Sequence, residues 1–211
     1  PANCVWEVTS GQAAAVFEVE ATGFWQVHRD APATLATEVT RACGPLEGKR
    51  VMELYSGSGL LTYFVADRLG ERGAMVTLEQ SPRAVAQAEV NLRALEGGGS
   101  VQFYEGDVDP EAVADLAAEL GNEVDVIILD PPRTGVGREV ARALCATEAD
   151  RIVLVSCDPA AGARDLAEFR AGGYELEALK AYDLFPHTHH FEMISTLQRL
   201  DGGANVPPAC E

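Results

Sequence analysis

Short apolar runs alternate along the chain with longer stretches in which apolar residues return every three or four positions. Runs of β-branched residues are typical of buried parallel strands, and the longer spacing is typical of amphipathic helices. The runs lie at 50–54, 74–78, 101–104, 124–129 and 152–155, and the helical patterns at 32–43, 60–69, 82–95, 111–120, 138–145 and 163–170. This alternation predicts an α/β fold with a doubly wound, Rossmann-like sheet.

Further strands are predicted near the two ends of the chain. Strands are predicted at 174–184 and 191–200, and their connection is too short for a crossover helix, so they form an antiparallel edge. The sheet is then seven-stranded and mostly parallel. Residues 5–27 alternate between apolar and polar, with turns at Ser10-Gly11 and Thr22-Gly23, which predicts two or three short strands, the last at 24–27.

We therefore divide the chain into three parts. Residues 1–30 are interpreted as the remnant of a small β-rich subdomain, and residues 31–200 as the main α/β domain. Residues 201–211 are rich in glycine and proline and are expected to be a disordered tail.

Composition indicates a protein of the cytoplasm. The sequence has 211 residues, of which 47% are hydrophobic, and no apolar run reaches the roughly 18 residues of a membrane span. The first residues do not resemble a signal peptide. The five cysteines are scattered without a C-x-x-C pair, which argues against a disulfide framework or a zinc site and for a reducing cytoplasm.

The net charge of −17 does not favour nucleic-acid binding, because the surfaces that bind nucleic acid are usually basic. Acidic residues are dense between 105 and 125, whereas arginines gather between 133 and 170, so a local basic face remains open.

Glycines and acids mark the ends of the first three strands. Gly57 and Gly59 allow a close backbone approach to a ligand at the start of a helix, and Glu79 follows at the distance of a ribose-binding acid. Asp107 ends the third strand. This pattern resembles the class I S-adenosylmethionine-dependent methyltransferases. The alternative is a set of tight turns and solvated acids.

A thiol, two prolines and a histidine run follow the later strands. Cys157 comes directly after the fifth strand, where ligands of open α/β sheets bind, although a free cysteine is more often a small buried residue. The segment 130–133 (Asp-Pro-Pro-Arg) ends the fourth strand and is either a rigid substrate loop or a plain connection. Adjacent His189 and His190 point to opposite faces of an extended strand, so no metal site is expected.

Four motifs occur in the order found in the RNA 5-methyluridine (uracil-C5) methyltransferase family, which the chain resembles over residues 16–200. They are Phe-Trp-Gln-Val at 24–27, Asp-Pro-Pro-Arg at 130–133, Ser-Cys-Asp-Pro-Ala at 156–160, and Phe-Pro-His-Thr-x-His-x-Glu at 185–192. The resemblance implies that Cys157 is the nucleophile and Glu192 the general base. It also implies that S-adenosylmethionine binds at Gln26, Tyr55, Leu60, Glu79 and Asp130.

The chemistry of uracil explains this choice of residues. Its C5 atom is a weak nucleophile, and addition of a thiolate to C6 makes C5 enolate-like. After methyl transfer, a carboxylate must remove the C5 proton. The thiol needs a lowered pKa, for which Arg133 and Arg164 are candidates. We expect Phe24, Arg133 and His187 to contact a base that is flipped out of the RNA.

The chain departs from the family pattern at several points. His28 replaces the usual Asn, and Ala161-Gly162 replace the usual Thr-Leu, which is expected to loosen the following helix. The family's RNA-docking domain and the iron–sulfur cysteines of some members are absent from this chain. The expected partner is RNA, with no membrane and no metal.

The sequence therefore predicts S-adenosylmethionine-dependent methylation of C5 of a uridine in tRNA or rRNA. One alternative is a class I methyltransferase that acts on another nucleobase or on a small molecule. Another is a module that binds the cofactor or RNA without turnover.

Overall fold

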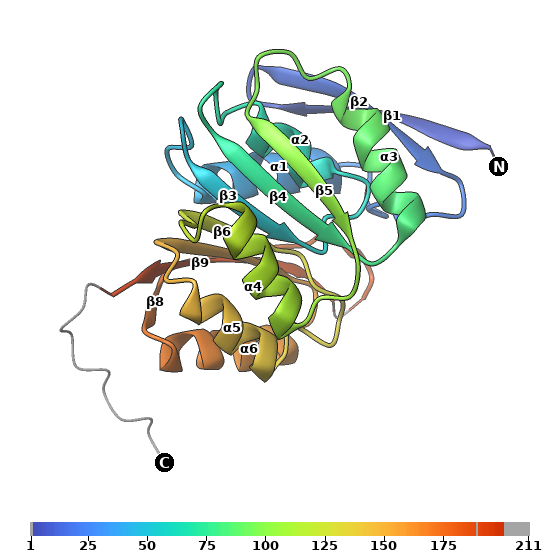
Figure 1. Ribbon diagram of the computed structural model, residues 1–211. Helices are drawn as coiled ribbons and strands as arrows, with labels where there is room; N and C mark the ends of the chain where they lie inside the picture. Colours follow the sequence, from blue (N-terminus) through green and yellow to red (C-terminus); the bar gives the residue numbers. More distant parts are fainter. Residues whose placement is uncertain (1, 189, 201–211) are drawn as a thin grey trace.

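Seven strands form one central sheet in the computed structural model, which describes residues 2–188 and 190–200. The strands are β3 (Arg50–Leu54), β4 (Ala74–Glu79), β5 (Ser100–Glu105), β6 (Val126–Leu129), β7 (Arg151–Ser156), β8 (Tyr174–Tyr182) and β9 (Glu192–Arg199). Their order in the sheet is β5-β4-β3-β6-β7-β9-β8 (Figure 1). The first five are parallel, and β9 runs antiparallel to both of its neighbours. The predicted fold is confirmed.

Six helices cover the two faces of this sheet (Figure 1). They are α1 (Ala31–Ala42), α2 (Leu60–Ala66), α3 (Pro82–Leu92), α4 (Pro110–Glu119), α5 (Arg138–Ala146) and α6 (Pro159–Ala171). Neighbouring residues of one strand serve opposite faces: Val51 packs with residues of α1 and α2, whereas Met52 packs with residues of α4 and α5. Both faces are apolar because both are covered, which explains the continuous apolar runs in the sequence.

The amino-terminal hairpin shares a core with the main sheet's helices. It consists of β1 (Asn3–Ser10) and β2 (Ala13–Glu20), paired in antiparallel register. The buried side chains of Val8, Phe17 and Val19 form one cluster with Leu60, Tyr63 and other residues of α1 and α2. The alternating pattern therefore marks a sheet that is buried on one face.

Of the two or three short strands predicted over residues 5–27, two form, and residues 24–27 have no regular secondary structure. The tail predicted to be disordered, 201–211, lies outside the described residues. Within the described ranges, no helix has the length and apolar character needed to cross a membrane.

Candidate active site

The reversed direction of β9 brings the two predicted catalytic residues to one edge of the sheet. Cys157 follows the last residue of β7, and Glu192 is the first residue of β9. Ser156 lies opposite Met193 in the antiparallel register of these strands. Glu192 therefore lies beside Cys157 at the edge where β6 and β7 also end. This is the ligand-binding edge of an open α/β sheet.

Glu192 is a buried carboxyl group with one oxygen atom that accepts no hydrogen bond from the described residues. Its residue is 5% exposed, and its Oε2 atom has no hydrogen-bond partner among the described residues. Burial raises the pKa of Glu192 to about 7, because a buried carboxylate loses hydration. The pKa of Asp130 is likewise raised to about 7, first by burial and then by the charge of Glu192.

The thiol of Cys157 is half-buried among these charges. Its pKa is raised, first by burial and then by Glu192 and Asp130, while the charge of Arg133 lowers it. The expected lowered pKa is therefore wrong, because burial and two carboxyl groups together outweigh one guanidinium. Arg164 is exposed, and its charge acts on Asp158.

The predicted cofactor loop has the left-handed backbone angles that glycine favours. Tyr55, Gly57 and Gly59 have φ angles of 64°, 54° and 84°, in the left-handed region. A side chain on Gly59 would lie 3.0 Å from Leu92 Cδ1 and 3.2 Å from Ala88 Cα, so the loop packs directly on α3. Leu60 then begins α2 and is buried.

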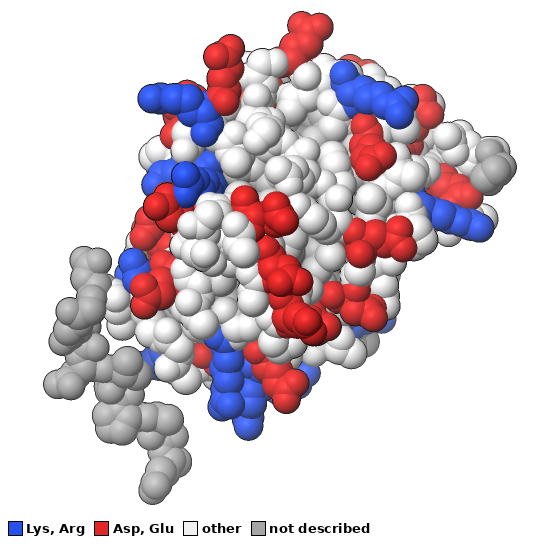
Figure 2. All heavy atoms as spheres, in the orientation of Figure 1, with Lys and Arg blue, Asp and Glu red and all other residues white. Residues whose placement is uncertain are grey.

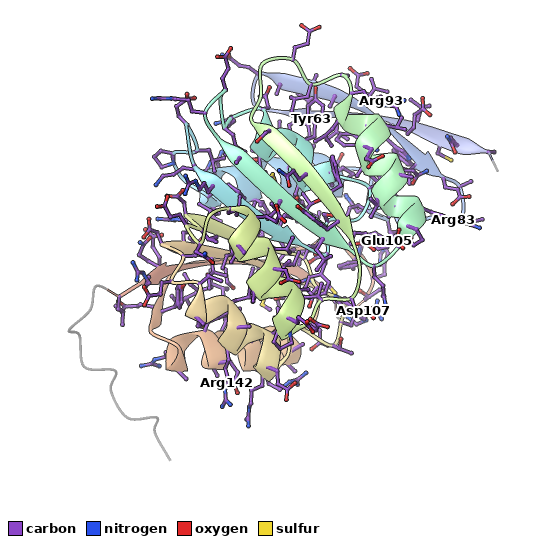
Figure 3. All side chains as sticks on the ribbon, viewed as in Figure 1. Tyr63, Arg83, Arg93, Glu105, Asp107 and Arg142 are labelled. Atoms are coloured by element: carbon purple, nitrogen blue, oxygen red, sulfur yellow. The ribbon has the colours of Figure 1, made fainter. Side chains whose placement is uncertain are left out.

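Glu79 closes this loop from the neighbouring strand. The backbone N–H of Gly57 donates to Glu79 Oε2 at 3.0 Å, and the N–H of Ser81 donates to Glu79 Oε1 at 2.8 Å. The carboxylate predicted to bind ribose thus also fixes the turn that would hold the ligand. Asp107, after β5, is exposed and accepts a hydrogen bond from Gln80 at 2.5 Å. Figure 3 shows Asp107 beyond Glu105 at this end of the sheet.

A further carboxyl group lies beneath the loop. Glu53, in β3, is 2% exposed and accepts a hydrogen bond from Thr62 Oγ1 at 2.6 Å. Burial raises its pKa to about 8, and the charges of Asp130 and Glu79 contribute to this rise. Three acids, Glu53, Asp130 and Glu192, thus lie at this end of the sheet, and burial raises the pKa of each.

The remaining predicted site residues differ in their exposure. Gln26 is half-buried, and Phe24 is 74% exposed. His187 is exposed and has a φ angle of 65°. His189 lies outside the described residues. Among those that are described, no group of three potential metal ligands occurs.

Two buried polar residues of the site were not predicted from the sequence. Asp165, in α6, accepts hydrogen bonds from the backbone of the loop that carries Arg133. Asn91, in α3, donates to the carbonyl oxygen of Ser58 in the glycine loop at 2.9 Å. Each occupies a position on the buried side of a helix, and a polar residue there is the only sequence signal for either role.

Residues 117–200 match the model of the family described as tRNA (uracil-5-)-methyltransferase. This range contains Asp130, Arg133, Cys157 and Glu192. The carboxyl-terminal part of the chain is therefore similar to the tRNA (uracil-5-)-methyltransferase family. Residues 28–111, which contain the glycine loop, match the model of a second methyltransferase family, protein-L-isoaspartate(D-aspartate) O-methyltransferase.

Curated proteins are similar to this chain over most of its length. A protein of Streptomyces avermitilis described as an uncharacterized RNA methyltransferase is 44% identical over 182 residues, which are 86% of this chain and 40% of that protein. A protein of Bifidobacterium longum with the same description is 40% identical over 87% of this chain and 42% of its own length. The chain thus spans about 40% of the length of these curated relatives.

The fold is that of the class I methyltransferases. The solved structure of Pyrococcus abyssi tRNA (uracil-54, C5)-methyltransferase in complex with S-adenosyl-L-homocysteine has a TM-score of 0.68 and 24% identity, and it covers 87% of this chain and 42% of that one. The predicted cofactor, S-adenosylmethionine, agrees with the methyltransferase families matched on both halves of the chain.

Proposed function

We propose that this protein transfers a methyl group from S-adenosylmethionine to C5 of a uridine in RNA, through a covalent bond between Cys157 and C6. One observation carries the proposal: at the ligand-binding edge of a methyltransferase fold, a thiol lies beside a buried carboxyl group whose Oε2 atom has no hydrogen-bond partner among the described residues. The relatives described as RNA methyltransferases support RNA as the substrate class.

The proposed reaction has three steps: addition of the thiolate, methyl transfer, and elimination. The Cys157 thiolate adds to C6, and the electron pair of the C5–C6 double bond moves toward C5 and the O4 carbonyl. C5 then takes the methyl group from the cofactor's sulfonium, which leaves as the neutral thioether. Glu192 removes the C5 proton, the double bond re-forms, and the C6–S bond breaks to release the thiolate.

The pKa of Glu192 suits the third step. A group with a pKa of about 7 is partly ionised at neutral pH and binds a proton readily, which a general base requires. Its protonated form also removes a negative charge from the neighbourhood of Cys157, and this favours the thiolate.

The cofactor would lie over the glycine loop. Tyr55, Gly57, Gly59 and Leu60 would approach it from β3 and α2, and Glu79 would bind its ribose hydroxyl groups. Asp130 would lie between the cofactor and the substrate base. Phe24 would stack on the base, and Arg133 and His187 would contact the RNA. The cytoplasm remains the predicted compartment.

The first test traps the covalent bond. The protein is incubated with S-adenosylmethionine and RNA that contains 5-fluorouridine, and the adduct is measured on a denaturing gel. Because fluorine cannot be removed as a proton is, the wild type accumulates the adduct. Cys157→Ala forms none, and the control Cys4→Ala, which changes an exposed cysteine of the hairpin, behaves like the wild type. An adduct with Cys157→Ala would refute the proposed nucleophile.

The second test identifies the product. After incubation with total RNA and methyl-labelled S-adenosylmethionine, the labelled nucleoside is expected to be 5-methyluridine. Glu192→Gln is expected to accumulate a methylated covalent RNA complex with ordinary uridine RNA, because the C5 proton stays in place. Label in another nucleoside, or in a small molecule, would support the corresponding alternative methyltransferase.

A further inference from the structure

Asp165 is a buried carboxyl group whose two oxygens serve a neighbouring loop. The residue is 3% exposed in α6. Its Oδ2 accepts from the backbone N–H of Val136 at 2.8 Å, and its Oδ1 accepts from that of Gly137 at 3.1 Å. No ion pair joins Asp165 to a Lys or Arg among the described residues. Burying a carboxylate costs free energy unless it is hydrogen-bonded. The hydrogen bonds from these two amides offset that cost.

The loop is shaped around this carboxylate. Gly135 has a φ angle of 83°, and a side chain built on it would lie 2.5 Å from Asp165 Oδ2. The N–H of Gly135 also donates to the carbonyl oxygen of Pro132 at 2.8 Å, which closes a turn with Arg133 as its second residue. The turn that carries Arg133 is therefore anchored, immediately after it, to Asp165.

One helix thereby connects the loop with the thiol. α6 begins directly after Asp158, which caps it by accepting from the N–H of Ala161 at 2.8 Å, and Cys157 precedes this cap. Asp165 lies about two turns further along the same helix. The backbone at Cys157 and the backbone of the loop that carries Arg133 are thus both tied to α6.

Three charged groups act on the thiol from the elements around it. Glu192 faces it from β9 and Asp130 from the end of β6, and both disfavour the thiolate. Arg133, from the loop, favours it. Displacement of Arg133 away from the thiol would weaken the one charge among these that favours the thiolate.

We propose that Asp165 is a positioning residue that holds the loop 131–137 so that Arg133 stays beside Cys157. This inference rests on the proposed function in so far as Cys157 is the nucleophile. Its test needs neither cofactor nor RNA, so that its outcome is separate from that of the methylation experiments.

The experiment measures the pH dependence of Cys157 alkylation by iodoacetamide, with peptide mass spectrometry to distinguish it from the other cysteines. Arg133→Ala and Asp165→Ala are both expected to slow alkylation at pH 8 by roughly threefold to tenfold, because a tenfold change corresponds to one pKa unit. The double variant is expected to be no slower than Arg133→Ala, because Asp165 acts only through Arg133.

A purely structural role gives a different result. In that case Asp165→Ala lowers the midpoint of thermal unfolding but leaves the pH profile of alkylation as in the wild type, which overturns the proposal. Additive effects in the double variant also overturn it. If Asp165→Ala does not fold, Asp165→Asn replaces it: its amide keeps one acceptor, and a smaller shift in the same direction is expected. An unchanged profile with Asp165→Asn counts against the proposal.

Discussion

At the scale of single residues, the carboxyl groups of Glu53, Asp130 and Glu192 are kept neutral at acidic pH by burial. For each, the pKa in the folded protein lies above its ordinary value, so the folded state binds a proton that the unfolded chain releases. Folding stability is therefore greatest below the unfolded pKa and falls as the pH rises toward the folded one. Between about pH 4.5 and 8, these acids oppose folding progressively.

Glu53→Gln is expected to remove part of this pH dependence. Glutamine can still accept the hydrogen bond of Thr62, but it carries no charge at any pH. In urea unfolding, the variant should gain stability relative to the wild type as the pH rises from 5 to 8. One pKa unit corresponds to about 1.4 kcal/mol, so the relative gain is several kcal/mol. Glu175→Gln, on the exposed strand β8, is the control and should show no such trend. If the free energy of unfolding fell equally with pH in the wild type and in Glu53→Gln, the buried Glu53 carboxyl group would not be the source of this pH dependence.

Glu192→Gln is expected to make Cys157 more reactive. The variant removes a negative charge that raises the pKa of the thiol, so that more thiolate is present at pH 8. Alkylation of Cys157 by iodoacetamide should become several-fold faster, whereas the buried Cys43, whose pKa is raised to about 12, should stay unreactive. Equal rates in the variant and the wild type would show that Glu192 does not act on the thiol.

The residues of this site differ in how well sequence predicts them. Cys157 and Asp130 follow apolar strands, and the carboxyl ends of parallel strands meet at one edge, so their proximity could be predicted. The raised pKa of Cys157 could not, because it depends on how deeply the thiol is buried and then on its distances to Glu192, Asp130 and Arg133. Asp165 and Asn91 bind backbone groups, and a backbone partner leaves no trace in the sequence.

At the scale of elements, α6 shows how the end of a strand becomes the start of a helix. The helical pattern predicted a start at 163, but α6 begins at Pro159, with Asp158 as its cap. Asp followed by Pro is a common helix start, because proline at the first position loses no hydrogen bond. The replacement at 161–162, expected to loosen the helix, instead brings it close to the sheet. A side chain on Gly162 would lie 3.0 Å from Met193 Cε and 3.1 Å from Ser156 Cβ.

Gly162→Leu is accordingly expected to destabilise the protein. The added side chain would enter the space between α6 and strands β7 and β9, and overpacking of a core costs about 1–3 kcal/mol. Urea unfolding measures this cost. Ala163→Leu places the same side chain on the exposed side of the same helix and should change stability little. Equal effects of the two substitutions would show that α6 does not pack as described.

At the scale of the whole molecule, Asn91 joins the hairpin to the cofactor loop. Its Oδ1 accepts from the N–H of Glu18 at 2.8 Å, and its Nδ2 donates to the carbonyl oxygens of Glu18 and Ser58 at 3.2 and 2.9 Å. The sequence predicted the hairpin and the loop separately. Their contact depends on how chain segments 73 and 33 residues away fold back onto α3, which local patterns do not contain.

Asn91→Ala is expected to weaken this connection and the cofactor site together. It leaves the buried carbonyl oxygen of Ser58 without this partner, at roughly 1–3 kcal/mol for a buried unsatisfied group, and it removes two part-buried bonds to the backbone of Glu18. Thermal unfolding should shift to a lower midpoint, and calorimetry should show weaker binding of S-adenosylmethionine. Asn3→Ala removes an exposed asparagine that also bonds Glu18, at its side chain, and is the control. Loss of stability without any change in cofactor affinity would limit Asn91 to a structural role.

The charge of the whole molecule leads to a prediction about salt. The net charge of −17 is the excess of 33 acidic over 16 basic residues, so ion pairs leave it unchanged. Acidic side chains gather over α4 on the face shown in Figure 2. Salt screens both the repulsion among the acidic side chains and the attraction within surface ion pairs. Because surface ion pairs contribute little to stability, the weaker repulsion determines the net change. The midpoint of thermal unfolding should therefore rise between 10 mM and 200 mM NaCl. A double variant of α4, Asp115→Asn with Glu119→Gln, should start higher at low salt and rise less. A midpoint that falls with salt would mean that the ion pairs outweigh the repulsion.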